Sequence, residues 1–387
     1  MESSGTTPPG GQSPAAVPEI AALFDGSGPF VTVYLTTEAA VEQAAQQNEL
    51  RWKALRRRLE EDGAPEAALA AVDPLVPDAH HYGRTLAVVA GAGGALLVRH
   101  EPERPARDAG WVAPLPRVGP LLEWAQAAVP HLVVLADRAG ADIVVLSRAA
   151  AGTGGGDAPV VTVGQSTGGD PDLRKTNPGG WSQRRYQNRA ENLWEHNARQ
   201  VAEQVAALSD EVGARLIVLA GDVRASGLLR EHLPGPVAAL VREVDGSRGA
   251  GSADNGLDEI ADDVVKLAAS VAAEDTVEFL RQFKQERGQN DLAAEGVAAT
   301  LEALAAARVD TLLVHDDPDD TRTAWFGPEP GMVAAGAAPL RDLGVEAPVE
   351  ARLVDVAIRA AFTTGASVRM IPSVGSVHDG LGAILRF

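Results

Sequence analysis

The sequence predicts an α/β protein of three domains, and three observations support this prediction. The chain has 387 residues, more than one hydrophobic core usually serves. Runs of β-branched and apolar residues alternate with segments in which apolar residues recur every three or four positions. Glycine-containing turns separate two pairs of apolar runs, a pattern typical of β-hairpins. We place the domains at 17–126, 127–275 and 276–387, after a disordered tail at 1–16 that is rich in Gly, Pro, Ser and Thr.

The N-terminal domain begins with a clear strand signal, since FVTVYLT at Phe30–Thr36 combines alternation with β-branched and aromatic residues. The remaining predicted elements of this domain are, in order, a helix at Glu42–Asp62 that ends before Gly63 and Pro65, a hairpin of Thr85–Ala90 and Ala95–His100, and a proline-rich linker or irregular edge at 102–120.

The middle domain is predicted as a mixed sheet with helices on its faces. Its predicted elements are a hairpin of His131–Ala136 and Ala141–Ser147, a strand at Pro159–Gln165, a mobile loop at Gly164–Gly180, a long helix up to Val212, a strand at Arg215–Ala220, a helix at Ala225–His232, a strand at Ala239–Val244 and a helix at Leu257–Glu274. We expect Ser182 to cap the long helix at its N-terminus and Gly213 to end it.

The C-terminal domain is predicted as a small α/β/α sandwich. Its predicted elements are helices near 276–287 and 291–307, strands at Thr311–Val314 and Thr323–Phe326, a helix at Val349–Ala361, and strands at Ser367–Met370 and Ala383–Phe387.

Composition excludes several classes of function. The chain has no cysteine, which excludes disulfides, thiol catalysis and cysteine-ligated metal sites. No apolar run is long enough for a membrane span, and the start lacks the pattern of a secretory signal, so we expect a cytoplasmic protein without a membrane partner. The net charge of −19 means that the overall field does not hold the chain on nucleic acid, and we expect no DNA partner.

One segment departs from the acidic composition. Between Leu173 and Ala190 there are five basic residues and no acidic ones. Two adjacent glycines let a backbone approach a ligand closely, and arginines bind phosphates or stack on bases. We therefore predict an RNA-binding or ribosome-binding loop made of Arg174, Lys175, Gly179, Gly180, Trp181, Ser182, Gln183, Arg184, Arg185 and Arg189. The same residues are explained equally well by a surface turn whose arginines are solvated.

These residues also resemble a known family. Gly179–Arg185 (GGWSQRR) and the trailing helix with Glu195-His196-Asn197 are similar to the Gly-Gly-Gln loop of archaeo-eukaryotic class I release factors. The glycine-rich end at Gly380–Phe387 resembles the close of their third domain. The chain looks like a bacterial member of this family, from the actinobacterial branch of the Balon-like and Pelota-like ribosome hibernation factors. The resemblance implies an RNase H-like middle domain and a C-terminal domain like kink-turn-binding ribosomal proteins.

One departure from the family motif affects the expected mechanism. Release factors place a glutamine directly after Gly-Gly, where it orders the water that attacks peptidyl-tRNA, whereas here Trp181 takes that place. We therefore expect no catalytic residue, cofactor or metal. The resemblance implies binding to the A site of the 70S ribosome, near the peptidyl transferase centre, in hibernation or stress protection without peptide release. It also suggests elongation factor Tu as a delivery partner.

Two other functions stay open at this point. Ser182-Gln183-Arg184 resembles the loop of a eukaryotic quality-control relative that cleaves peptidyl-tRNA, so a peptidyl-tRNA hydrolase or a nuclease in ribosome rescue is the alternative. The third possibility is an interaction protein in which the basic segment binds an acidic protein surface and has no RNA role.

Overall fold

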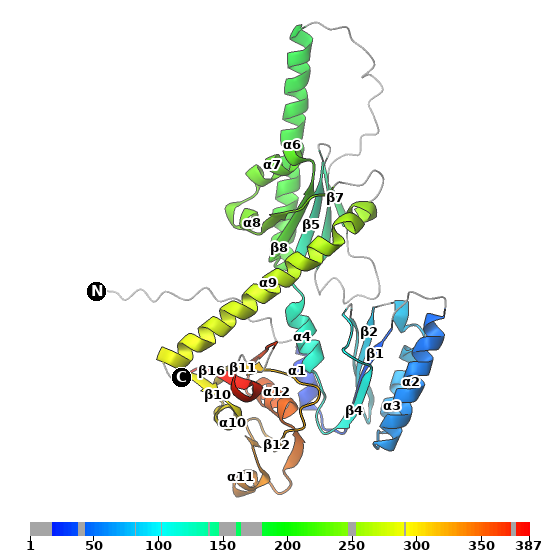
Figure 1. Cartoon of the computed structure of the whole chain (residues 1–387), viewed down its shortest axis with the longest axis vertical. Helices are drawn as coiled ribbons and strands as arrows, with labels where there is room; N and C mark the ends of the chain where they lie inside the picture. The colour runs from blue at the N-terminus through cyan, green and yellow to red at the C-terminus, as the bar shows by residue number, and fades with distance from the viewer. Residues whose placement is uncertain are drawn as a thin grey trace, which may run out of the picture. The chain divides into compact units, whose positions relative to one another are not determined.

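The computed structural model is a mixed α/β protein with several sheets, which confirms the predicted fold class at this level. It describes residues 18–37, 43–81, 83–101, 103–137, 140–146, 160–163, 180–246, 253–289, 292–372 and 377–387, with the backbone alone at 81, 160–163, 180–194, 253–255 and 289. The predicted tail at 1–16 lies outside these residues. The chain divides into two compact units (Figure 1): unit 1 comprises 1–126 and 275–387, and unit 2 comprises 127–274.

The first part of unit 1 is a four-stranded antiparallel sheet in the order β3-β2-β1-β4. Its elements are α1 (Pro18–Ala22), β1 (Phe30–Thr36), α2 (Ala44–Glu61), α3 (Glu66–Val72), β2 (Thr85–Gly91), β3 (Gly94–Glu101), β4 (Ala109–Ala113) and α4 (Gly119–Ala127). Helices α2 and α3 cover one face of the sheet (Figure 1), where Leu55 and Leu69 share a buried core with Val33. The predicted hairpin is confirmed, because β2 pairs with β3 in antiparallel register.

The proline-rich segment 102–120 was predicted as a linker or an irregular edge, and in the structure it forms an edge of the sheet and not a linker. It contains β4, which pairs along the central strand β1, and the beginning of α4. The hydrogen bonds that hold β4 come from a strand more than 70 positions earlier, so the local sequence carries little sign of them. Helix α3 was also missed, because its seven residues are too few for a helical period to stand out.

The second part of unit 1 contains a four-stranded sheet in the order β10-β16-β11-β15 and a three-stranded sheet in the order β13-β12-β14. Their strands and helices are β10 (Ala293–Glu295), α10 (Val297–Ala305), β11 (Val309–Val314), β12 (Thr323–Phe326), β13 (Val333–Ala334), α11 (Ala337–Asp342), β14 (Val349–Arg352), α12 (Leu353–Thr363), β15 (Ser367–Met370) and β16 (Leu381–Leu385). Along β11, Leu312 packs in the core that contains α12, whereas Leu313 packs with Phe283 on the opposite face. This alternation follows from the two-residue repeat of a strand buried on both sides.

Four predicted helices have different limits in the structure. The helices expected at Leu257–Glu274 and 276–287 form one helix, α9 (Ala253–Gln289), because no proline interrupts this segment. The helix expected at 291–307 begins only at Val297, after strand β10. The helix expected at Val349–Ala361 begins at Leu353, because Val349–Arg352 pair with β12 as β14.

The two parts of unit 1 share one hydrophobic core. Tyr34 and Trp124 meet edge to face with ring centroids 5.7 Å apart, and both belong to the same cluster as Val356 of α12. The side chain of Gln126 donates to the Val368 carbonyl and accepts from the Met370 amide, both at 2.9 Å. The division into domains at 17–126 and 276–387 thus stays a prediction, and the structure joins these two segments in one unit.

Unit 2 is built on a five-stranded mixed sheet in the order β7-β6-β5-β8-β9. Its elements are β5 (His131–Ala136), β6 (Ala141–Leu146), β7 (Val160–Val163), α6 (Gly180–Val212), β8 (Leu216–Gly221), α7 (Val223–His232), α8 (Gly235–Ala239), β9 (Val241–Glu243) and the first part of α9. The predicted hairpin of β5 and β6 is confirmed, and β8 runs parallel to β5. Helices α6, α7 and α8 pack on one face and α9 packs on the other.

Candidate functional site

The structure describes only part of the predicted loop. Arg174, Lys175 and Gly179 lie outside the described residues. The backbone of the other seven predicted residues belongs to helix α6; these are Gly180, Trp181, Ser182, Gln183, Arg184, Arg185 and Arg189. The predicted N-cap at Ser182 is wrong, because the helix already begins at Gly180. The residues after Gly180 include no glycine or proline, so nothing in the local sequence opposes an earlier start.

Helix α6 carries the motif at the end of a long arm. With 33 residues, the helix is about 50 Å long. Among its described side chains, Glu195 and His196 are exposed, and the first buried one is Ala198. The helix covers about 25 Å between Gly180 and Asn197, and its N-terminal part projects beyond the strands of the unit 2 sheet (Figure 1).

The base of the arm is fixed firmly in the core of unit 2. Val201, Val205 and Leu208 recur on one face of α6 and pack in the cluster that contains Ile143 of β6 and Leu229 of α7. Such a stripe buries one side of the helix against the sheet. The arm is therefore attached to a rigid support, and its direction is set by the packing of its C-terminal half.

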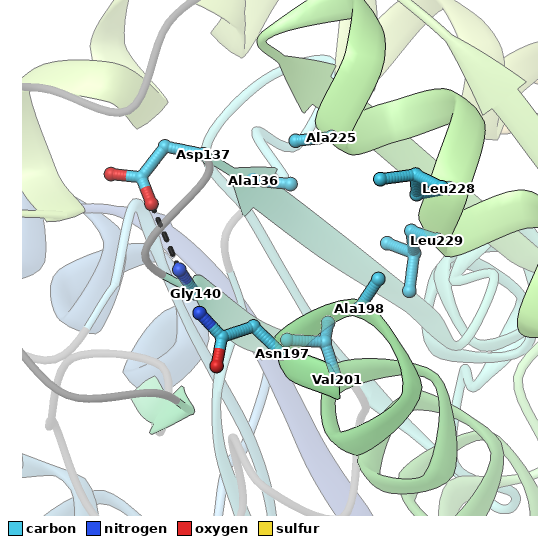
Figure 2. A pocket seen from close by; sticks show the side chains of 9 residues that line it. All are labelled: Ala136, Asp137, Gly140, Asn197, Ala198, Val201, Ala225, Leu228 and Leu229. Carbon is cyan, nitrogen blue, oxygen red and sulfur yellow. Dashed lines mark hydrogen bonds between the residues drawn. The ribbon is translucent and has the colours of Figure 1, made fainter. Parts of the chain in front are cut away.

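A small pocket lies where the arm leaves the sheet (Figure 2). It is lined by Ala136, Asp137, Gly140, Asn197, Ala198, Val201, Ala225, Leu228 and Leu229, and its volume is about 20 Å³. A site of this size holds about one water molecule and excludes an organic substrate. The pocket is thus a junction between the arm, the β5–β6 turn and α7, and we assign it no substrate.

The turn beside this pocket is held by its own aspartate. A carboxylate oxygen of Asp137 accepts a hydrogen bond from the amide of Gly140 at 2.9 Å (Figure 2), and the amide of Asp137 donates to the carbonyl of Gly140 at 2.9 Å. The sequence pattern predicted this turn only as a hairpin connection. The proximity of this turn to Asn197 was not predicted.

The neighbouring end of β8 is tightly constrained. Gly221 has a φ of +138°, and a Cβ atom there would lie 1.8 Å from the carbonyl oxygen of Ala136 on β5. The next residue, Asp222, caps α7 by accepting hydrogen bonds from the amides of Arg224 and Ala225 at 3.0 and 3.2 Å. Only glycine fits between the two parallel strands at this position.

A single histidine of the unit 2 sheet has a shifted pKa. Burial lowers the pKa of His131, whose Nδ1 lies 2.7 Å from the Val129 carbonyl. The imidazole is therefore neutral at pH 7, with Nδ1 as the donor. His131 lies at the opposite end of β5 from Asp137, so it takes no part in the junction at the base of the arm.

The described residues contain neither a cluster of metal ligands nor a helix suited to span a membrane. Within those residues, no three side chains among His, Asp and Glu come together in a way that would hold a metal ion. In the same part of the chain, no helix combines the length and apolar character needed to cross a membrane.

Known proteins show similarity both to unit 2 and to the whole chain. Residues 130–289 match the family model described as bacterial archaeo-eukaryotic release factor family 2. The uncharacterized protein Rv2629 of Mycobacterium tuberculosis (strain H37Rv) is 26% identical over 373 residues, which cover 94% of this chain and 95% of that protein. The similarity to Rv2629 therefore extends over both units.

Two solved structures are similar at lower identity. Pelota of Archaeoglobus fulgidus is 15% identical with a TM-score of 0.37, and the match covers 95% of this chain and 91% of Pelota. Archaeal Pelota bound to the ribosome with ABCE1 is 14% identical with a TM-score of 0.34, and the match covers 96% and 93%. Superpositions this loose do not define the fold, so the assignment depends on the family match. That match agrees with the resemblance seen in the GGWSQRR motif: residues 130–289 are similar to bacterial archaeo-eukaryotic release factor family 2.

Proposed function

We propose that this release-factor-like protein binds the A site of the ribosome and silences or protects idle ribosomes without releasing peptide. The observation that carries the proposal is the α6 arm, which begins inside the motif Gly179–Arg185 and covers about 25 Å between Gly180 and Asn197. The family match over residues 130–289 supports the same role, since the family is one of release factors.

The dimensions and charge of the arm suit a narrow RNA cavity. A single helix is about 10–12 Å wide, so it enters spaces that exclude a whole domain. The five basic residues between Leu173 and Ala190 are attracted to phosphates, whereas the rest of a chain with a net charge of −19 is repelled by them. Electrostatics thus favour an approach in which the arm enters first and the body stays outside.

The absence of peptide release follows from Trp181. The motif has tryptophan where the release factors of the resemblance have glutamine, and an indole does not position an attacking water as a glutamine does. A geometric error of about 1 Å costs roughly 100-fold in rate. In this proposal the bulky Trp181 occupies the place of the reacting groups and supplies contact with RNA bases by stacking.

Three finer features complete the proposal by analogy with the family. The mixed sheet of unit 2 is the RNase H-like domain, and residues 276–387 correspond to the domain related to kink-turn-binding ribosomal proteins. Delivery to the ribosome uses elongation factor Tu.

The test is co-sedimentation of the full chain with 70S ribosomes from starved cells over a series of salt concentrations. The test variant is Arg184→Gln/Arg185→Gln, near the start of the arm. The matched control is Arg199→Gln/Arg230→Gln, which removes the same charge from two exposed arginines of unit 2 that pair with Glu195 and Glu243. Each lost phosphate contact should reduce the slope of log affinity against log salt by roughly 0.7 to 0.9. We expect this reduction of the slope in the arm variant and not in the control.

Three results would contradict the proposal. In the first, the wild-type protein stays in the ribosome-free fraction at low salt. In the second, the arm variant and the control bind equally well, which favours an interaction through another surface. In the third, the purified protein frees peptide from stalled complexes and Gln183→Ala abolishes this, which favours the alternative of a peptidyl-tRNA hydrolase in ribosome rescue.

A further inference from the structure

Unit 1 contains a cavity that plays no part in the proposed ribosomal role. Its volume is about 540 Å³, and its walls come from β4, the loop before β12, and β14. Pockets that bind small molecules usually measure about 300–1,000 Å³. Three arginines line the cavity, namely Arg117, Arg322 and Arg352.

Two of these arginines already have carboxylate partners. Arg352 is buried, and it donates to Asp316 and to the main-chain oxygen of Asp317. Arg322 holds Asp320 through Nε and Nη2, with the shortest contact at 2.7 Å. These guanidinium groups are therefore engaged within the protein and are poor candidates for binding a ligand.

The acidic groups of the lining are engaged as well. Arg107 donates to Asp319 at 2.9 Å, and the hydroxyl of Thr323 donates to Glu350 at 2.7 Å. Among the described residues that line the cavity, each carboxylate thus has a hydrogen-bond partner within the protein.

Arg117 differs from the other two arginines. Its guanidinium carbon lies 4.6 Å from the centre of the Trp111 ring, and its Nε is buried without a hydrogen-bond partner. Among the described residues, no hydrogen bond or ion pair reaches this guanidinium group. Stacking on an indole uses the face of a guanidinium and leaves its in-plane N–H donors available.

The position of Arg117 does not depend on its side chain. Its amide donates to the hydroxyl of Thr32 at 3.2 Å, and its carbonyl accepts from the hydroxyl of Tyr34 at 2.7 Å. Burial lowers the pKa of Arg117, and the more distant carboxylates of Asp355 and Asp316 only partly oppose this effect. A half-buried cation is thus held at the cavity wall without a direct counter-ion.

We propose that this cavity binds a small organic carboxylate, with Arg117 as its bidentate partner. The planar fork of arginine matches the two oxygens of a carboxylate. A multiply charged phosphate or a nucleic-acid backbone fits less well, because Arg322 and Arg352 are already paired with carboxylates and Asp319, Asp320 and Glu350 also line the cavity. One negative charge neutralises Arg117, and further negative charge meets these acids.

In the experiment, the full chain is titrated with three probes, and binding is measured by ligand-observed NMR and calorimetry. Benzoate is the carboxylate probe, benzamide is its neutral isostere, and inorganic phosphate is the competing anion. Arg117→Gln removes the charge, and Arg117→Lys keeps the charge but removes the fork. Arg107→Gln is the matched control, since Arg107 lies near the same cavity but already pairs with Asp319.

We expect saturable binding of benzoate, and at least tenfold weaker binding of benzamide and of phosphate. Arg117→Gln should weaken benzoate binding at least tenfold, Arg117→Lys should weaken it severalfold, and Arg107→Gln should change it less than twofold. The proposal is overturned if benzoate does not saturate, if phosphate binds as tightly as benzoate, or if Arg117→Gln binds like the wild type. Circular dichroism establishes that each variant is folded, and the lysine variant supplies the comparison if Arg117→Gln is not.

Discussion

Replacing Gly221 by alanine tests how closely the carboxyl ends of β5 and β8 are packed beneath the α6 arm. The added Cβ would lie 1.8 Å from the Ala136 carbonyl oxygen and 2.8 Å from its carbon. The two strands must move apart by roughly 1.6 Å to restore ordinary contact, which begins at 3.4 Å. That movement also lengthens the hydrogen bond from the Asp222 amide to the same oxygen, which is 3.1 Å long in the native structure.

The expected cost is the sum of three effects. A φ of +138° is strained for any residue with a side chain, which costs about 1–3 kcal/mol. Overpacking between the strands adds about 1–3 kcal/mol, and a weakened hydrogen bond adds about 1 kcal/mol. We expect Gly221→Ala to lower the free energy of unfolding by about 4 kcal/mol. Gly213→Ala is the matched control: its φ is +61° but its Cβ has no neighbour within 4 Å, so the cost is about 1 kcal/mol.

The measurement is urea-induced unfolding of both variants, combined with hydrogen exchange of the amides in β5 and β8. Exchange in these two strands should accelerate in Gly221→Ala and remain near the wild-type rate in Gly213→Ala. The packing argument is refuted if the two variants lose the same stability within about 1 kcal/mol, since backbone strain alone would then explain both.

Two further predictions concern the buried charges of unit 1. Burial raises the pKa of Asp355 to about 7, against the effect of Arg352, so between about pH 4 and pH 7 the folded protein binds a proton that the unfolded chain has lost. The free energy of unfolding should therefore fall by up to about 4 kcal/mol as the pH rises through this window, and it should level off above it. Urea unfolding of Asp355→Asn and the wild type at pH 5 and pH 8 tests this, because the variant should gain stability relative to the wild type at pH 8. An equal difference at both pH values would contradict the prediction. Arg352→Met leaves the largely buried Asp316 without its partner and should lower the free energy of unfolding by about 3–5 kcal/mol. Arg230→Met removes an exposed pair with Glu243 and should lower it by less than about 1 kcal/mol. Thermal unfolding measures both, and equal shifts in Tm would show that burial does not set the cost.

Elements with strong local patterns were predictable from the sequence. The apolar runs of β5 and β6 predicted a hairpin because both strands are buried and adjacent along the chain. Strand β4 was not predictable in the same way, since its five half-buried residues are ordered by pairing with β1. Likewise, the pattern at Val349–Arg352 continues into α12, and only pairing with β12 makes these residues a strand.

In the candidate site, too, some features could be predicted from the sequence and others depend on tertiary contacts. The residue types around Gly179–Arg185 indicated the resemblance to release factors, because they can be read from the sequence without knowledge of any contact. The length of the arm depends on where α6 becomes buried, which is a tertiary property. The cavity at Arg117 brings together β4 and β14, which lie more than 230 positions apart in the sequence. No local sequence pattern therefore predicts the cavity.

The common core of residues 1–126 and 275–387 makes unit 2 an insertion within unit 1. The first segment leaves the ribosome early, but Tyr34 and Trp124 complete their packing only after α12 has been synthesised. During synthesis the nascent N-terminal segment exposes this apolar face until the last residues arrive. Closing the chain across the 148 residues of unit 2 costs about 4 kcal/mol of entropy when they are unfolded. Early folding of the insert shortens that closure, so the order of synthesis favours completion of unit 1.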